Sequence, residues 1–400
     1  MQFTQLPSQL VAAKPILDRI NAAGFAAYFV GGCVRDMILG ESLHDVDIAS
    51  SAYPEEIKAI FDRTVDTGIQ HGTVMVLDHG EGYEITTFRT ESTYTDFRRP
   101  DSVTFVRSLE EDLKRRDFTI NAFALDADGS VIDLFDGLGD LEKKQIRAVG
   151  KPNERFTEDA LRMMRALRFA SKLNFSIEEG TLEALKELSP NLKKIAVERI
   201  QVEFEKLLMG QAASQSLLTM VEVGLLPYFP GQKGMVIDQH LLLLANWLEK
   251  KQPKTLLEVW TLYLGTGGFN PDELQTELRA WKLSREIMAT VTRLSKAIEK
   301  RNDLSTWDLY QINDLADTFL AVIEMMGVDF SLIEDIKKRL NALSIRSGKD
   351  IVVNGGQLIQ SGIATPGPGL GKLLHEIEQA IVCGELSNTK EAIFDFAKEH

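Results

Sequence analysis

Two adjacent glycines, Gly31 and Gly32, directly follow the apolar run at residues 27–30. An apolar and aromatic run of this length predicts a buried strand, and glycine lets the backbone turn sharply and approach a ligand closely. Residues 34–39 then have the pattern of a short helix, whose unpaired N–H groups and positive dipole end would face the turn. A strand, a glycine turn and a helix in this order predict a phosphate-binding site.

Two aspartates, Asp45 and Asp47, lie at the start of a second predicted strand, 46–50. Successive side chains of a strand point to opposite faces, so we expect both carboxylates on one face, with Val46 and Ile48 entering the core. Neighbouring carboxylates repel each other unless a cation lies between them, which predicts a Mg²⁺ site. A phosphate site beside a divalent metal suits the transfer of a phosphoryl or nucleotidyl group.

Two further stretches carry polar side chains that suit the same chemistry. Glu84 lies in another predicted strand, 83–87, either as a third carboxylate of the metal site or as a surface acid of an edge strand. The string Arg-Arg-Asp-Phe-Thr-Ile-Asn-Ala begins at Arg115. On its own an arginine pair before an acid is typical of a solvated helix end, but the guanidinium of Arg116 offers the fork of donors that binds phosphate.

A helix predicted over residues 155–172 places Asp159, Arg162 and Arg165 at intervals of three, beside an apolar face. By spacing alone this is an amphipathic helix with ion pairs. The side-chain chemistry suggests more, because an aspartate accepts a hydrogen bond from an exocyclic amine and an arginine donates one to a ring nitrogen. Cytosine and adenine present that pair of groups, whereas uracil and guanine present a carbonyl beside an N–H. Since each unmatched group costs about 1–3 kcal/mol, one Asp–Arg pair could select C and A without a nucleic-acid template.

Together these motifs resemble the class II branch of the DNA polymerase beta-like nucleotidyltransferases, which contains CCA-adding tRNA nucleotidyltransferases and bacterial poly(A) polymerases. Residues 31–36 with 45–47 resemble the first motif of this branch, 115–122 the second and 158–170 the fourth. The resemblance implies that Asp159 and Arg162 are the pair that selects the base. Residues 198–206 resemble the helix that braces the nucleotide-selecting helix, which implies a structural role. The expected site comprises catalytic Asp45, Asp47 and Glu84, the first two as metal ligands, and nucleotide-binding Gly32, Arg35, Arg116, Asp159, Arg162, Arg165 and Arg168.

The resemblance implies template-independent addition of C, C and A to the 3′ end of tRNA, from CTP and ATP, with release of pyrophosphate. A bacterial poly(A) polymerase and a catalytically inactive RNA-binding relative are the alternatives. Residues 90–103 are polar and without periodicity, and their segment 94–100 resembles the flexible loop that CCA-adding enzymes need for the final adenosine. Residues 133–137 are a turn signal, in a region that serves as a hinge in the family.

The overall composition bears on the partners and the cellular compartment of the protein. The net charge of −14 is unusual for a protein that handles RNA, but residues 143–206 carry fourteen Lys and Arg against ten Asp and Glu, which fits local contact with an RNA backbone. The N-terminus lacks a signal-peptide pattern and no apolar run has membrane-spanning length. The two cysteines suggest no disulfide framework. We expect a cytoplasmic protein that binds tRNA and no membrane, with a homodimer left open.

The predicted fold class is α+β, an α/β nucleotidyltransferase head followed by an elongated all-helical body and tail. Strands are expected at 27–30, 46–50, 73–77, 83–87, 122–125 and 131–134, and a short helix at 54–61. The expected domains are a catalytic head at 1–150, a helical neck with the nucleotide-selecting helix at 151–210, a helical body at 211–295 and a tRNA-binding helical tail at 296–400.

Overall fold

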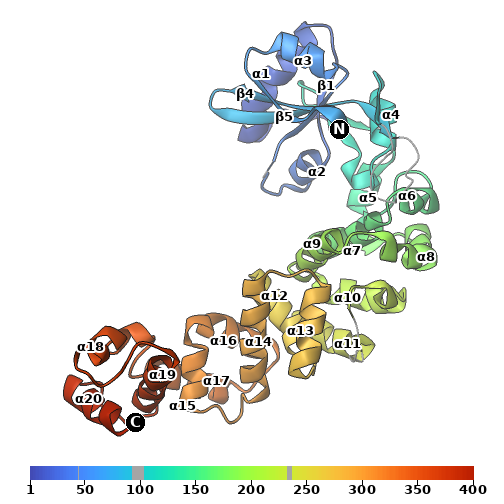
Figure 1. The fold of residues 1–400 in the computed structure, drawn as a ribbon. Coiled ribbons are helices and arrows are strands. Elements are labelled where there is room, and N and C mark those ends of the chain that lie inside the picture. Colours follow the sequence, from blue (N-terminus) through green and yellow to red (C-terminus); the bar gives the residue numbers. More distant parts are fainter. Residues whose placement is uncertain (44, 92–102, 232–236) are drawn as a thin grey trace. The chain divides into compact units, whose positions relative to one another are not determined.

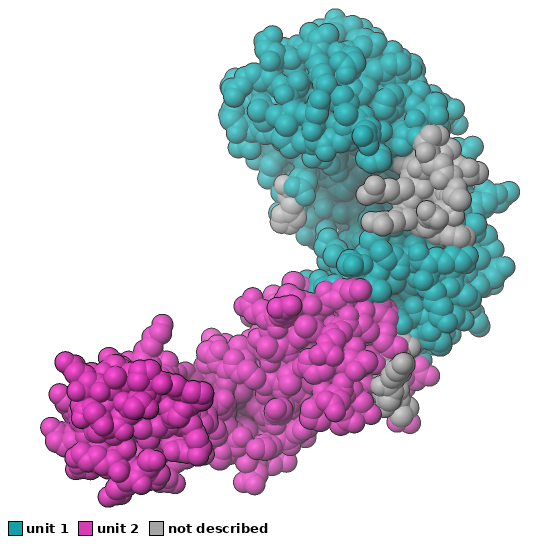
Figure 2. Space-filling view, viewed as in Figure 1, with its two compact units in different colours: residues 1–229 teal, residues 230–400 magenta. Residues whose placement is uncertain are grey.

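The computed structural model describes residues 1–43, 45–91, 103–231 and 237–400. The chain divides into two compact units, Met1–Phe229 and Pro230–His400 (Figures 1 and 2). The first unit contains the sheet and a group of helices, and in the described part of the second unit every regular element is a helix. The predicted α+β class is confirmed, whereas the finer division into head, neck, body and tail stays a prediction. The loop segment 94–100 lies outside the described residues.

The first unit begins with a seven-stranded sheet in the order β3–β4–β5–β2–β1–β8–β9. Strands β2 and β5 pair in parallel and the other neighbours are antiparallel. All six predicted strands are present, with bounds within two residues of the prediction, and the edge strand β3 was not predicted. The strands are β1 Ala27–Val30, β2 Asp47–Ser50, β3 Thr64–Gly68, β4 Thr73–Asp78, β5 Glu81–Thr87, β8 Phe123–Leu125 and β9 Val131–Asp133, and a separate hairpin pairs β6 Arg89–Glu91 with β7 Val103–Phe105.

Apolar side chains of the sheet and of the long first helix form the core of the head. Helix α1 spans Ser8–Ala22 and buries Leu10, Ile16 and Ile20 completely, at the spacing of one helical face. The central strands bury Phe29 and Ile85. The remaining helices of the head are α2 Gly32–Leu39, α3 Pro54–Ile60, α4 Leu109–Lys114 and α5 Gly137–Glu142.

The helices that follow the sheet differ from the prediction at one point. The predicted continuous helix 155–172 is wrong, because the chain forms α6 Pro152–Glu158 and α7 Leu161–Leu173 with Asp159 between them. Asp159 has φ −135° and ψ 103°, and its Oδ1 accepts a hydrogen bond from the backbone N–H of Leu161 at 2.9 Å. The side chain satisfies a donor in the first turn of the next helix, which is how aspartate favours a helix start over a helix interior. Asp159 therefore does not share a helical ridge with Arg162 and Arg165.

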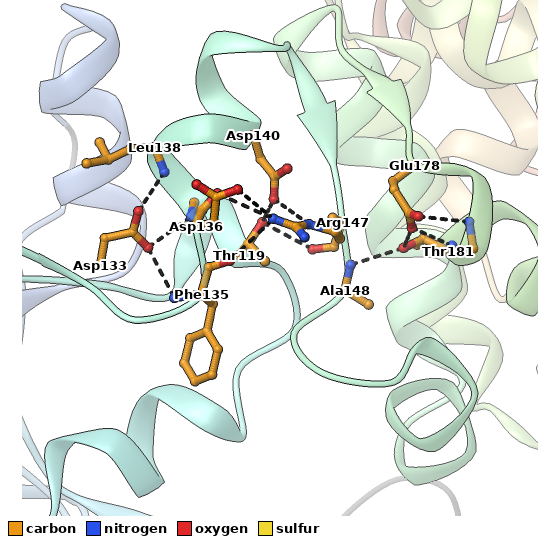
Figure 3. Close-up of polar contacts among 12 residues, drawn as sticks. Thr119, Asp133, Phe135, Asp136, Leu138, Asp140, Arg147, Ala148, Glu178 and Thr181 are labelled. Atoms are coloured by element: carbon orange, nitrogen blue, oxygen red, sulfur yellow. Dashed lines mark hydrogen bonds and ion pairs between the residues drawn. The ribbon is translucent and has the colours of Figure 1, made fainter.

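The connection between the sheet and these helices is held by polar contacts, one of them around a buried carboxylate (Figure 3). The carboxylate of Asp133 accepts the backbone N–H groups of Phe135, Gly137 and Leu138, so the predicted turn at 133–137 is present. Asp140 is 1% exposed and accepts hydrogen bonds from the hydroxyl of Thr119 at 2.5 Å and from Nε of Arg147 at 2.8 Å. A buried carboxylate with two donors from other elements fixes the path of the chain here.

A short parallel ladder and three more helices complete the first unit, and the second unit continues with helices. The ladder pairs β10 Gln145–Ile146 with β11 Ser176–Ile177, next to α8 Glu179–Leu188, α9 Val197–Leu208 and α10 Ala213–Glu222. The α-helices of the second unit are α11 Ile237–Leu248, α12 Leu256–Trp260, α13 Pro271–Ala280, α14 Arg285–Glu299, α15 Thr306–Gln311, α16 Ala316–Met325, α17 Phe330–Asn341, α18 Gly355–Gln360, α19 Pro368–Val382 and α20 Lys390–Glu399. Among the described residues, no helix has the length and apolar character that crossing a membrane requires.

Candidate active site

Three carboxylates line one hollow where strand β2 begins beside the middle of strand β5. Asp47 of β2 lies opposite Glu84 of the parallel strand β5, and Asp45 precedes Asp47 by two residues. All three residues are exposed and line one hollow beside the first turn of α1. Because β5 lies between β4 and β2, Glu84 is not an edge-strand acid, and that interpretation is wrong. Because Glu84 lies directly across from Asp47, its role as a third carboxylate of the metal site stays a prediction.

The electrostatic environment of Asp47 fits a cation. Protein atoms that shield its carboxyl group raise the pKa of Asp47, and the negative charges of Asp45 and Glu84 raise it further, although Arg116 opposes them. A carboxylate among like charges gains most from a positive ion placed between them. The described residues contain no cluster of three or more Asp, Glu, His or Cys side chains that encloses a metal. The donor set nevertheless fits a hard cation that takes its remaining ligands from phosphates and water.

The glycine turn brings an arginine up to these carboxylates. Gly31 has φ +73°, in the left-handed region that favours glycine, and a Cβ built on it would lie 3.0 Å from Nη1 of Arg116 and 3.9 Å from Oδ2 of Asp47. Any side chain at this position would therefore be strained and would press against the guanidinium. The following residue, Gly32, begins α2, and a Cβ built on it would lie 3.6 Å from Nη2 of Arg35.

A buried carboxylate that the sequence analysis missed holds the arginine pair. Asp112 of α4 is 1% exposed and accepts hydrogen bonds from Nη2 of Arg115 at 2.7 Å and from Nη2 of Arg116 at 3.2 Å. Burial alone would raise the pKa of Asp112, but Arg115 and Arg116 lower it below its usual range. The signal was present, because Asp112 precedes the two arginines by three and four residues and such residues are neighbours on a helix.

Most of the predicted site residues line a second, basic cavity of about 660 Å³ within the first unit. Nine Lys and Arg side chains and three Asp side chains line it, an excess of six positive charges in a chain whose net charge is −14. Such a concentration of guanidinium groups suits a polyphosphate. Eight of the ten predicted residues line this cavity: Gly32, Arg35, Asp47, Arg116, Asp159, Arg162, Arg165 and Arg168. The other two, Asp45 and Glu84, share the neighbouring hollow with Asp47.

The two residues predicted to select the base have separate partners. Oδ2 of Asp159 accepts a hydrogen bond from Nη2 of Arg199 of α9 at 2.8 Å. Nη1 of Arg162 donates to Oε2 of Glu158 at 2.8 Å, and its Nη2 donates to the backbone oxygen of Arg115 at 3.0 Å. Within the described residues no ion pair joins Asp159 to Arg162. Arg199 was expected to have only a structural role and lines the cavity instead.

The other arginines of the cavity are held by acids and by one aromatic ring. Arg165 pairs with Asp117 at 2.5 Å, and Arg168 pairs with Glu203 of α9. The guanidinium groups of Arg165 and Arg168 lie 5.4 Å and 3.9 Å from the centre of the Phe169 ring. A third guanidinium, that of Arg35, lies 5.2 Å from the same ring. This ring therefore packs among three positive charges, an arrangement stabilised by cation–π attraction.

Arg35, which was predicted to bind the nucleotide, is buried. It is 3% exposed, and its guanidinium donates to Oδ1 of Asp36 at 2.8 Å and to the side-chain oxygen of Asn121. Asn121 in turn donates to Asp117 at 3.2 Å. Arg35 is thus connected through Asn121 and Asp117 to Arg165, so that helix α2 and helix α7 are joined by one polar network.

Comparisons with known proteins cover the whole chain. The poly A polymerase head domain matches residues 27–147, an RNA- and SrmB-binding site of polymerase A matches 174–235, and a tRNA nucleotidyltransferase domain 2 matches 251–397. The chain is 51% identical to a CCA-adding enzyme of Leuconostoc citreum, over 100% of this chain and 98% of that one. It is 48% identical to a CCA-adding enzyme of Enterococcus faecalis, again over 100% and 98%.

Solved structures give the same picture. The CCA-adding enzyme of Bacillus stearothermophilus in complex with CTP is 38% identical, with a TM-score of 0.84 and 98% of each chain covered. The CCA-adding enzyme of Thermotoga maritima complexed with tRNA is 22% identical, with a TM-score of 0.68 over 99% of this chain and 96% of that one, a likeness of fold.

The match of the head, together with carboxylates that face an arginine-rich cavity, places the chain among the nucleotidyltransferases. Nucleotidyltransferases of this kind depend on a metal. Since full-length relatives are about half identical, the chain belongs to the family of CCA-adding enzymes.

Proposed function

We propose that this protein adds C, C and A to the 3′ end of tRNA from CTP and ATP, and that the incoming nucleotide binds in the basic cavity. The observation that carries the proposal is the excess of six positive charges around a cavity that also contains the selecting residues Asp159 and Arg162. Identity of about half to CCA-adding enzymes over the full length favours this activity over a poly(A) polymerase, whose head domain is similar.

Asp45 and Asp47 would hold Mg²⁺, with Glu84 as the third carboxylate. The ion would lower the barrier by activating the 3′ hydroxyl of the RNA and by neutralising charge on the departing pyrophosphate. The raised pKa of Asp47 and the position of Glu84 across the strand pair support this assignment. The carboxylates also fix the reacting end of the RNA beside the cavity, because Asp47 lines both the hollow and the cavity.

The arginines would bind the triphosphate and stabilise the charge that develops on it. In the reaction the 3′ oxygen of the RNA forms a bond to the α-phosphorus, the bond from that phosphorus to the β-phosphate bridge breaks, and pyrophosphate leaves. Arg116, held by Asp112 beside the glycine turn, is preorganised for this charge, and Gly32 and Arg35 line the same cavity. Arg165 and Arg168 would provide additional nucleotide contacts.

Asp159 and Arg162 would choose the base. An ionised carboxylate only accepts hydrogen bonds and a guanidinium only donates them, so together they match the amine and ring acceptor of cytosine or adenine. With uracil or guanine, the base carbonyl would face the carboxylate, two acceptors, and the base N–H would face the guanidinium, two donors. Each such mismatch leaves buried polar groups unpaired, at about 1–3 kcal/mol.

The test is incubation of the protein with a tRNA that ends at the discriminator base and all four nucleoside triphosphates, followed by sequencing of the product ends. Products that end in CCA support the proposal. Long adenosine tails would indicate a poly(A) polymerase, and unextended RNA in the presence of Mg²⁺ would indicate an inactive RNA-binding relative.

A further inference from the structure

Arg199 lies in a stretch whose expected role was to brace the nucleotide-selecting helix, yet it contacts the base-selecting aspartate directly. Its Nη2 donates to Oδ2 of Asp159 at 2.8 Å, although the two residues lie 40 positions apart in the sequence. The other oxygen of that carboxylate, Oδ1, accepts the backbone N–H of Leu161. Both oxygens of Asp159 are therefore oriented by the protein, one by α7 and one by α9.

The contact with Arg199 keeps Asp159 from forming an ion pair with Arg162. Asp159 and Arg162 carry opposite charges and line the same cavity, and a direct ion pair between them would occupy the groups that must contact the base. In the described residues each has another partner, Arg199 for Asp159 and Glu158 for Arg162, at 2.8 Å in both cases. The side chains of the Arg199–Asp159 pair are 29% and 14% exposed, so solvent screens their attraction only in part.

We propose that Arg199 is a positioning residue for nucleotide selection: it holds the carboxylate of Asp159 toward the incoming base and away from Arg162. The inference rests on the proposed function. One further donor supports it, because Nη1 of Arg199 is buried and has no hydrogen-bond partner among the described residues, although this side chain lines the cavity. A merely structural arginine gains nothing from a buried donor that is left unpaired.

The charge and the shape of Arg199 contribute differently, and two substitutions separate them. Arg199→Ala removes the partner of Asp159, which then becomes free to pair with Arg162. Arg199→Lys keeps a positive charge but loses the planar fork of donors that fixes the carboxylate. We therefore expect Arg199→Ala to lower the preference for CTP over UTP on the order of tenfold, and Arg199→Lys to lower it less. Gln201→Ala is the matched control, since Gln201 lies on the same helix and donates to Glu205.

The experiment is a double-mutant cycle on Arg199 and Asp159, read out as the ratio of kcat/KM for CTP to that for UTP on a tRNA ending before the first C. If Arg199 acts through Asp159, the double variant Arg199→Ala/Asp159→Ala is no less selective than Asp159→Ala alone. Gln201→Ala keeps the wild-type ratio. Circular dichroism and the thermal midpoint report folding, and Arg199→Lys replaces Arg199→Ala in the cycle if the alanine variant does not fold.

Selectivity losses that add up in the double variant would overturn the inference, as would wild-type selectivity in every folded Arg199 variant. The activity of the wild-type protein distinguishes a failure of this inference from a failure of the proposed function. A wild-type chain that adds no cytidine to this tRNA overturns the proposed function, and the inference with it. An active wild type with unchanged selectivity in the variants overturns the inference alone.

Discussion

Replacing Arg165 by methionine should destabilise the first unit by an amount that depends on pH. Arg165 pairs with Asp117 at 2.5 Å, and the side chain of Asp117 is 9% exposed. Burial alone would raise the pKa of Asp117, but the charge and hydrogen bond of Arg165, followed by the charge of Arg162 and a hydrogen bond from Asn121, lower it from 3.8 to about 2. Methionine keeps the apolar stem of the side chain and removes the charge, which leaves a buried carboxylate without its main partner.

The magnitude follows from the pKa shift. A lowered pKa in the folded state contributes stability above the pKa of the unfolded state, and this contribution is lost as the pH falls through the folded value. A shift from 3.8 to about 2 corresponds to about 2–3 kcal/mol at pH 7. Arg165→Met removes the main contribution that lowers the pKa of Asp117, while the charge of Arg162 and the hydrogen bond from Asn121 remain. The pKa of Asp117 is therefore higher in the variant than in the wild type, and the variant takes up a proton at a higher pH. The difference in unfolding free energy between wild type and variant should therefore stay constant near neutral pH and shrink once the pH falls below the pKa of Asp117 in the variant.

Urea unfolding followed by circular dichroism at several pH values measures this difference. The four tryptophans lie between residues 247 and 307, in the second unit, so their fluorescence is a reference signal from that unit. Lys151→Met is the matched control, because Lys151 belongs to an exposed ion pair and its loss should change the unfolding free energy little. A destabilisation by Arg165→Met that is the same at pH 7 and pH 4 would refute the reasoning.

Three further changes test other parts of the site. Asp47→Asn should abolish nucleotide addition, yet without metal it should raise the unfolding free energy at pH 7.5 by less than about 1 kcal/mol, because the raised pKa of Asp47 means that its charged form is disfavoured. Thermal midpoints with and without Mg²⁺ check this, and a lower metal-free midpoint in the variant would contradict it. Asp112→Asn should lower the unfolding free energy by about 3 kcal/mol and raise KM for both CTP and ATP, because Arg115 and Arg116 lose their buried anionic partner. Unchanged KM values would show that the carboxylate of Asp112 does not order Arg116. Shortening residues 94–100 should slow adenosine addition about tenfold and cytidine addition much less, measured on tRNAs ending in CC and before the first C; equal losses would refute a selective role.

Strong local patterns made the head predictable. The run 27–30, the glycine turn and the alternation around Asp47 depend on neighbours in sequence, and the structure has β1, α2 and β2 where they were expected. Strand β3 escaped prediction because it is a polar edge strand, paired only with β4, so little of it needs to be apolar. The break before α7 escaped prediction because the apolar spacing continues through it, whereas the hydrogen bond that Asp159 accepts from the backbone N–H of Leu161 starts a new helix there.

Contacts between segments that are far apart in the chain could not be predicted from the sequence. Nothing near Arg199 indicates that it contacts a residue 40 positions away, and a helical pattern explained it sufficiently. The pairing of Asp117 with Arg165 spans 48 positions in the same way. The resemblance named residues that lie together around one cavity, but the acids that hold those residues in place became visible only in the fold.

The central claim is that Asp159 and Arg162 act as a template made of protein. Single-turnover rates with each of the four nucleoside triphosphates test it most directly, on tRNA ending before the first C and on tRNA ending in CC, for the wild type, Asp159→Ala and Arg162→Ala. The account predicts that both variants accept UTP and GTP far better relative to CTP and ATP than the wild type does, because the mismatched groups no longer face an opposing acceptor or donor. Variants that are slower or less stable but keep the wild-type discrimination against UTP and GTP would contradict it.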